Sequence, residues 1–252
     1  MEMEKEKVFE KYESRGADYH WKQIDKKNFS LFNAFVYARY YFFIKAIKKN
    51  IQNNEIKIVD FGCGDGVQLH LIKKYLKNID AFGIDLSDTA LAIADKKIKG
   101  TFKKSSVYNT PFEDNAFDVS ISSDVIEHVQ EPLKMIAEMK RVTKTNGIIV
   151  IGTPIKYTEK PLDAMHVKEY FQEEFKSLFL REKFEIISYS ETHSLFLTLL
   201  YVKHTKILGR NVPIFRYLIN IITILFDKNY FLDSSKNNAD QMSYQFIILK
   251  KK

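Results

Sequence analysis

An acid followed by alternating glycines stands near residue 60 and has the composition of a cofactor loop. The stretch from Asp60 to Gly66 has the sequence Asp-Phe-Gly-Cys-Gly-Asp-Gly and follows the β-branched residues of a predicted buried strand over 56–61. Glycine permits positive φ and lets the backbone approach a ligand closely. Helix-forming residues over 68–77 come next, so the free N–H groups of a helix start face the same turn. The pattern predicts a site for a nucleotide cofactor.

The spacing of these glycines distinguishes two kinds of cofactor. Dinucleotide-binding loops have the pattern G-x-G-x-x-G and hold a pyrophosphate, but Val67 stands where the third glycine would be. The order acid-x-Gly-x-Gly-x-Gly instead resembles motif I of the class I S-adenosylmethionine-dependent methyltransferases. That cofactor has a sulfonium and an amino-acid end, so the carboxylate of Asp60 suits it, whereas the same carboxylate would repel a pyrophosphate.

A second group of residues with possible chemistry is Asp124-x-x-Glu127-His128, just past a predicted strand over 119–122. In a helical turn these three side chains would share one face. Carboxylates and imidazoles together can hold a divalent metal. The element resembles one in the ubiquinone-pathway O-methyltransferases and in the small-RNA 3′-end methyltransferases, where a downstream histidine completes a metal site. By this resemblance the metal ligands are Asp124, Glu127, His128 and His166.

A role without metal is also compatible with this group. Many class I methyltransferases carry a Glu-His-Val sequence here and bind no metal. His128 and His166 are then predicted to be catalytic and to face the methyl acceptor, because a histidine of near-neutral pKa can remove a proton from a hydroxyl. The sequence leaves both roles open.

Further cofactor contacts follow from the resemblance. Asp85 ends the second predicted strand (81–84), where such folds hydrogen-bond a ribose. Ser106 stands where relatives usually place an acid that holds the adenine amine. The segment from Pro111 to Val119, Pro-Phe-Glu-Asp-Asn-Ala-Phe-Asp-Val, is also similar to one that the family carries before its fourth strand. The implied cofactor-binding residues are Asp60, Gly62, Gly64, Asp85, Leu86, Ser106, Val107 and Ser122.

The elements that must position these residues alternate between strands and helices. Strands are predicted over 56–61, 81–84, 101–107, 119–122, 148–152, 184–190 and 244–249, and helices over 29–49, 89–99, 132–143 and 166–179. Such alternation predicts an α/β fold with a mostly parallel, Rossmann-like doubly wound sheet of seven strands and helices on both faces. The resemblance implies that the last two strands form an antiparallel edge. The predicted organisation is an N-terminal helical lid over 1–50 and a methyltransferase domain over 51–252.

A helical insertion is predicted over 192–240, before the last strand. It contains the apolar segments 195–202 and 212–226, interrupted by Lys203, Lys206, Arg210 and Arg216. Its composition suits a lid or pocket for a bulky or lipid-linked acceptor, and peripheral attachment to an anionic membrane through 195–226. A hairpin packed as extra core, or a dimer interface, would have the same composition.

The composition of the chain limits its compartment and its binding partners. The chain has 252 residues, of which 45% are hydrophobic, enough for one large domain with a sizeable core. Its single cysteine fits a reducing compartment, and the N-terminus shows no signal-peptide pattern, so a cytoplasmic protein is expected, with contact at the inner membrane face as an option. The net charge of +7 rests mostly on lysine and argues little for nucleic acid.

These observations favour an S-adenosylmethionine-dependent O-methyltransferase acting on a small molecule or a glycan precursor. Three alternatives remain from the sequence. The first is an RNA 3′-end methyltransferase with a metal site, the second a nicotinamide-dependent oxidoreductase, and the third a methyltransferase-like subunit that binds the cofactor without turnover.

Overall fold

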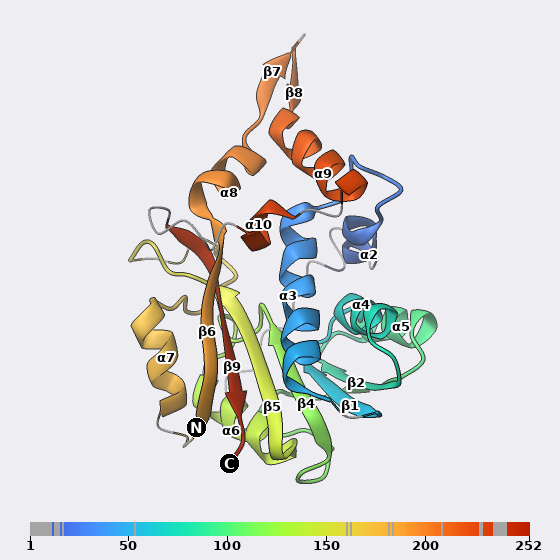
Figure 1. The fold of residues 1–252 in the computed structure, drawn as a ribbon, viewed down its shortest axis with the longest axis vertical. Helices are drawn as coiled ribbons and strands as arrows, with labels where there is room; N and C mark the ends of the chain where they lie inside the picture. The colour runs from blue at the N-terminus through green and yellow to red at the C-terminus, as the bar shows by residue number, and fades with distance from the viewer. Residues whose placement is uncertain are drawn as a thin grey trace.

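A seven-stranded sheet runs through the centre of the computed structural model (Figure 1). The structure describes residues 12, 16, 18–52, 54–159, 161, 163–180, 182, 184–207, 209–226, 229–233 and 241–252. Five neighbouring strands are parallel, in the order β3 (Thr101–Lys104), β2 (Ile79–Asp85), β1 (Ile56–Phe61), β4 (Phe117–Ser123) and β5 (Thr143–Pro154). The antiparallel strand β9 (Met242–Lys250) lies between β5 and the edge strand β6 (Glu185–Ser194). The predicted mostly parallel sheet with an antiparallel edge is confirmed.

Helices cover both faces of this sheet because its strands are apolar on both sides. In β1, Ile58 packs into one hydrophobic cluster and its neighbour Val59 into the other. The first cluster includes residues of α3 (Ala34–Asn50), α4 (Val67–Tyr75) and α5 (Asp88–Lys97). The second includes residues of α6 (Pro132–Val142) and α7 (Gln172–Leu180). The fold is therefore doubly wound, with the carboxyl ends of the parallel strands directed toward one side.

Two predicted helices begin later along the chain than expected. Helix α3 begins at Ala34 rather than at residue 29, because the side chain of Asn33 accepts a hydrogen bond from the backbone N–H of Val36 and caps the helix. Helix α7 begins at Gln172, so the prediction of a helix from His166 was wrong. The segment before it is held in an irregular path by two backbone N–H groups, those of residues 167 and 168, which donate to the carbonyl oxygen of Glu127.

The N-terminal region is built into the domain. Helix α3 contributes buried side chains along its whole length, including Phe43 and Ile47, and packs against β5 and α4. The short helix α2 (Tyr19–Ile24) lies beside it. The predicted lid over 1–50 falls partly outside the described residues, which start at Tyr12.

The insertion before the last strand projects from the end of the sheet, at the top of Figure 1. It consists of α8 (Leu195–Val202), a hairpin of β7 (Thr205–Ile207) and β8 (Arg210–Val212), α9 (Ile214–Phe226) and the short α10 (Tyr230–Asp233). Residues 192–194 belong to β6, so the insertion begins at 195, and residues 234–240 lie outside the described residues. Within the described part, each helix is too short or too polar to span a lipid bilayer.

Candidate cofactor and acceptor site

The glycine loop lies at the carboxyl end of β1 and is held by β2. Backbone N–H groups of Gly62 and Cys63 both donate to the carbonyl oxygen of Ile84, at 2.9 Å. The N–H of Gly64 donates to Oδ2 of Asp85, at 2.8 Å. Gly62 and Gly64 have φ of 75° and 52°, values that disfavour a side chain. The loop therefore exposes its backbone to the cavity beside it, as the sequence predicted.

Two carboxylates, the buried Asp60 and the half-buried Asp85, lie beside this loop. Asp60 is buried within β1. Its burial and, to a lesser extent, the nearby charge of Asp85 raise the pKa of Asp60 well above its ordinary value. Burial also raises the pKa of Asp85, opposed by hydrogen bonds from the backbone of Ser87 and Gly64. Two desolvated acids at one place favour a positively charged ligand, because a cation would stabilise their ionised forms.

Aromatic side chains from the N-terminal region, within the predicted lid over 1–50, lie over the loop. A Cβ at Gly64 would collide with the hydroxyl oxygen of Tyr12, so that tyrosine stands directly over the glycine. Tyr12 packs against Tyr19 and His20 with ring centroids 5.7 Å apart in both pairs. The indole N–H of Trp21 donates to the carbonyl oxygen of Asp65, at 3.0 Å. These contacts hold the aromatic side chains in place over the loop.

Most of the predicted cofactor residues line one cavity of about 950 Å³. Its lining includes Asp60, Gly62, Gly64, Asp85, Leu86 and Val107. Ser122 does not line it, because its hydroxyl donates to the carbonyl oxygen of Phe61 inside the sheet, and the next residue, Ser123, lines the cavity instead. Ser106 does not line the cavity either, whereas its neighbour Ser105 does. The hydroxyl of Ser106 accepts a hydrogen bond from the N–H of Tyr108. The predictions for these two serines are not supported by their positions.

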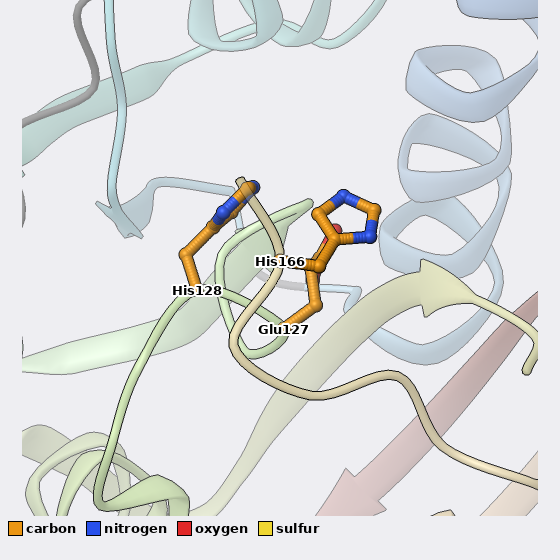
Figure 2. Close-up of side chains that lie close together, drawn as sticks. All are labelled: Glu127, His128 and His166. Atoms are coloured by element: carbon orange, nitrogen blue, oxygen red, sulfur yellow. The ribbon is translucent and has the colours of Figure 1, made fainter. Parts of the chain in front are cut away.

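The acid and histidine group lines the same cavity as the glycine loop. Figure 2 shows Glu127 and His128, from the turn after β4, meeting His166 from the loop after β5. One ligand atom from each of the three lies within 4.8 Å of the others, and the two imidazole centroids are 4.9 Å apart. The structure thus brings together three of the four residues predicted as metal ligands.

Asp124 lies outside this group, which corrects the prediction of four ligands. Its φ is 56°, so the backbone turns away before the turn that carries Glu127, and the shared helical face does not form. Its carboxylate instead forms an ion pair with Arg39 of α3, at 2.5 Å. Sequence reasoning missed Arg39, because an ion pair between residues so far apart in the chain leaves no local pattern.

Hydrogen bonds to oxygen set the orientation of both imidazoles. Nδ1 of His128 lies 3.0 Å from the carbonyl oxygen of Met165, which can only accept, so this nitrogen carries a proton. Nδ1 of His166 lies 2.6 Å from Oε1 of the buried Glu169. In the neutral form of each ring, Nε2 then has the lone pair and is the atom that can take up a proton.

Glu127 is fully buried between these groups. Its Oε2 accepts a hydrogen bond from the hydroxyl of Thr153 at 2.9 Å, while Oε1 has no hydrogen-bond partner among the described residues. Burial, followed by the charge of Asp124, raises the pKa of Glu127 to about 8. At neutral pH this carboxyl group is therefore mostly protonated.

We expect the buried Glu127 to make stability depend on pH. As pH rises from 4.5, the ordinary glutamate pKa, to about 8, the unfolded chain loses a proton that the folded chain keeps. Stability should therefore fall with rising pH by up to about 1.4 kcal/mol per pH unit across this window. Glu127→Gln should remove that slope in urea unfolding, and Glu113→Gln, at an exposed site, should preserve it. Parallel pH profiles for wild type and Glu127→Gln would contradict the assignment.

Comparison with known proteins identifies a domain within this chain. Residues 59–151 match the model of a family described as a methyltransferase domain. The chain carries a class I S-adenosylmethionine-dependent methyltransferase domain. The matched stretch begins in β1 and ends in β5, so it contains the glycine loop, both acids and the turn with Glu127 and His128. The cofactor of this methyltransferase domain is S-adenosylmethionine, which removes the nicotinamide alternative.

Several curated relatives that match this chain over part of their length are methyltransferases. A probable S-adenosylmethionine-dependent methyltransferase of Mycobacterium tuberculosis is 25% identical over 49% of this chain and 46% of its own. The demethylmenaquinone methyltransferase of Thermotoga maritima is 28% identical over 42% of this chain and 47% of its own. The chain spans about half the length of the curated relatives it matches.

The fold of the whole chain is also found among solved structures. A methyltransferase in complex with the Trm112 methyltransferase activator of Haloferax volcanii superposes with a TM-score of 0.64. The alignment covers 97% of this chain and 99% of that one at 13% identity. At this identity the similarity shows the fold of the methyltransferase domain and its flanking elements alone.

Proposed function

We propose that the protein transfers a methyl group from S-adenosylmethionine to a hydroxyl oxygen of a small molecule. The observation that carries the proposal is the pair His128 and His166, which face the same cavity as the glycine loop. Each ring has Nδ1 next to a protein oxygen, so each can use Nε2 as a base.

The glycine loop fits the amino-acid end of this cofactor. Nε2 of Gln68 and Oδ2 of Asp65 are buried beside the loop without a hydrogen-bond partner among the described residues. A carboxylate could accept from the first and an ammonium could donate to the second. The raised pKa of Asp60 also fits a cationic neighbour. We therefore assign Asp60, Asp65 and Gln68 to the amino-acid end, and Asp85 to the ribose.

The chemistry asked of the protein is modest. The bound cofactor supplies an electrophilic methyl carbon on a sulfonium. The chain aligns an acceptor with it, which can lower a barrier by several kcal/mol. Nε2 of His128 or His166 removes the proton of the acceptor hydroxyl. Glu169 orients His166, because its Oε1 lies 2.6 Å from Nδ1 of that ring.

A small or lipid-linked acceptor, such as a sugar or glycan precursor, fits this cavity better than RNA does. Apart from its histidines, the described lining is rich in carboxylates, and its one arginine is paired with an aspartate. These acids are Asp60, Asp65, Asp85 and Asp163, together with Asp124, which is paired with Arg39, and Glu127, which is mostly protonated. A phosphate backbone is bound through positive groups, and a lining whose one arginine is already paired with an aspartate suits it poorly.

A divalent metal is left out of this proposal. The geometry of Glu127, His128 and His166 would allow three ligand atoms, but Asp124 is held by Arg39. Glu127 would also have to lose a proton to coordinate, against a pKa of about 8. The histidines therefore serve as bases in the proposal.

Calorimetric titration tests the cofactor part. We expect binding of S-adenosylmethionine and of its demethylated product, and none of NADH. Transfer of a labelled methyl group to a panel of hydroxyl, amine and carbon-acid acceptors then tests the reaction. Labelling of hydroxyl acceptors supports the proposal. Labelling confined to amines or carbon acids would refute O-methylation, and cofactor binding without any transfer would favour the non-catalytic alternative.

A further inference from the structure

We infer that the outer face of α8 and α9 docks on an anionic membrane surface and places the opening of the cavity at the lipid. The α8–α9 face is defined by its exposed apolar side chains. In α9 these are Ile214, Phe215, Leu218, Ile221, Leu225 and Phe226, and in α8 they are Phe196, Leu199 and Val202. Both helices stand clear of the sheet in Figure 1.

Helix α9 is oriented with its polar side chains inward. The fully buried Asn220 donates to the carbonyl oxygens of Phe29 and Phe32, at 2.9 and 2.6 Å. Its Oδ1 accepts from the hydroxyl of Tyr201 at 2.7 Å and from the N–H of Ala34 at 3.2 Å. Turning the helix to bury its apolar side would break all four bonds and leave buried polar groups unpaired. The outward orientation of the apolar side is therefore built into the fold.

Charge favours an anionic partner for this face. In sequence, residues 195–226 contain the basic residues Lys203, Lys206, Arg210 and Arg216 and no aspartate or glutamate. The hairpin β7–β8 next to the two helices carries Lys206 and Arg210. Apolar side chains beside basic ones are the composition of a helix that lies in the interface of an anionic membrane.

A second copy of the chain fits this face poorly. In a two-fold symmetric dimer the same patch meets itself, so its basic residues would face their own copies with no acidic residue between them. A lipid surface with anionic headgroups has the complementary sign and no fixed shape. The described helices are too short or too polar to cross a bilayer, as noted above, so this contact would be peripheral.

The cavity reaches the surface on this same face. Val202, at the end of α8, lines the cavity and is 58% exposed. A protein docked through α8 and α9 therefore has its cavity open toward the lipid, where an amphiphilic acceptor could enter without leaving the membrane. This last step rests on the proposed function, whereas the docking itself does not.

Sedimentation with vesicles tests the docking. We expect the full chain to pellet at low salt with phosphatidylcholine vesicles that contain phosphatidylglycerol, and only weakly with pure phosphatidylcholine. Leu225→Glu/Phe226→Glu, at side chains 68% and 72% exposed, should lower the partition coefficient by more than about tenfold. Leu180→Glu, at a 67% exposed leucine of α7, should leave it unchanged. Equal partitioning of all three proteins would overturn the inference.

A second pair of variants tests the charge. Lys206→Glu/Arg210→Glu should reduce binding by at least about tenfold, given about 1 kcal/mol for each basic residue near an anionic surface. Lys48→Glu/Lys49→Glu, at the far end of α3, should have no effect. Analytical ultracentrifugation without lipid completes the test. A wild-type dimer that Leu225→Glu/Phe226→Glu converts to monomer, without vesicle binding by the wild type, would assign the face to a second copy and refute the membrane.

A tryptophan reporter tests where the cavity opens. Val202→Trp should be quenched by brominated lipid on vesicle binding, whereas Leu180→Trp and the native Trp21 should not. An unquenched Val202→Trp in a protein that still pellets would refute this placement. Calorimetric binding of S-adenosylmethionine by every variant shows that it is folded. If the wild type pellets but does not bind this cofactor, the proposed function fails and the docking stands.

Discussion

Replacing His128 and His166 together with alanine should lower kcat by about 10²–10⁴-fold, the usual range for loss of a general base. The expectation follows from the geometry of the two rings, whose centroids are 4.9 Å apart and whose Nδ1 atoms lie against protein oxygens. Each single variant should lose less, because the remaining histidine can still take the proton. The measurement is transfer of a labelled methyl group to an acceptor that the wild type accepts.

The controls for this double variant separate catalysis from binding. The affinity for S-adenosylmethionine should stay within about twofold of the wild type, because neither histidine is among the residues assigned to the cofactor. His204→Ala, at an exposed histidine between α8 and β7, should retain full turnover. A chelator should leave the wild type active, whereas a metal-dependent enzyme would lose its activity. Full turnover by the double variant would refute the assignment of either histidine as a base.

Replacing Asp85 with alanine should weaken binding of S-adenosylmethionine by at least about 100-fold, since hydrogen bonds to a charged group contribute about 1.5–3 kcal/mol each. Asp85 accepts from the N–H groups of Gly64 and Ser87, so its loss also removes one of the three hydrogen bonds that hold the glycine loop to β2. Calorimetric titration measures the affinity directly. Asp85→Asn should have an intermediate affinity, because its amide oxygen can still accept one of these bonds.

The matched control lies on the same strand. Asp80 is exposed and belongs to β2, so Asp80→Ala changes the charge of the strand without touching the cavity. Its affinity for the cofactor should equal that of the wild type. Wild-type affinity in Asp85→Ala would mean that the loop keeps its shape unaided and that the ribose is bound elsewhere.

Local patterns predicted the centre of the sheet well. Strand β1 has the predicted bounds, 56–61, because a β-branched run followed by a glycine turn allows one interpretation. Strand β5 extends beyond its predicted range, 148–152, at both ends. Its first residues include Asn146 and Gly147, which usually indicate a turn, and the strand is irregular there: Asn146 has a φ of 65°, and the pairing with β4 is interrupted between Thr143 and Ile148.

The parts of the site that the sequence missed depend on contacts between distant segments. The pair of Arg39 with Asp124 joins α3 to the end of β4, and Tyr12 reaches Gly64 across the cofactor loop. Spacing along one segment contains no information about such pairs. The segment before α7 was also predicted wrongly, since its path depends on the carbonyl oxygen of Glu127 rather than on its own amphipathic pattern.

The place of β9 in the sheet has a consequence for synthesis on the ribosome. This strand is the last of the described strands to be made, yet it lies between β5 and β6. Until it emerges, β6 lacks its neighbour in the sheet, and α8, α9 and α10 follow a strand that is not yet paired. The apolar side chains of α8 and α9 are thus exposed while the chain is still being synthesised. During this period such surfaces are most prone to aggregate or to be bound by chaperones.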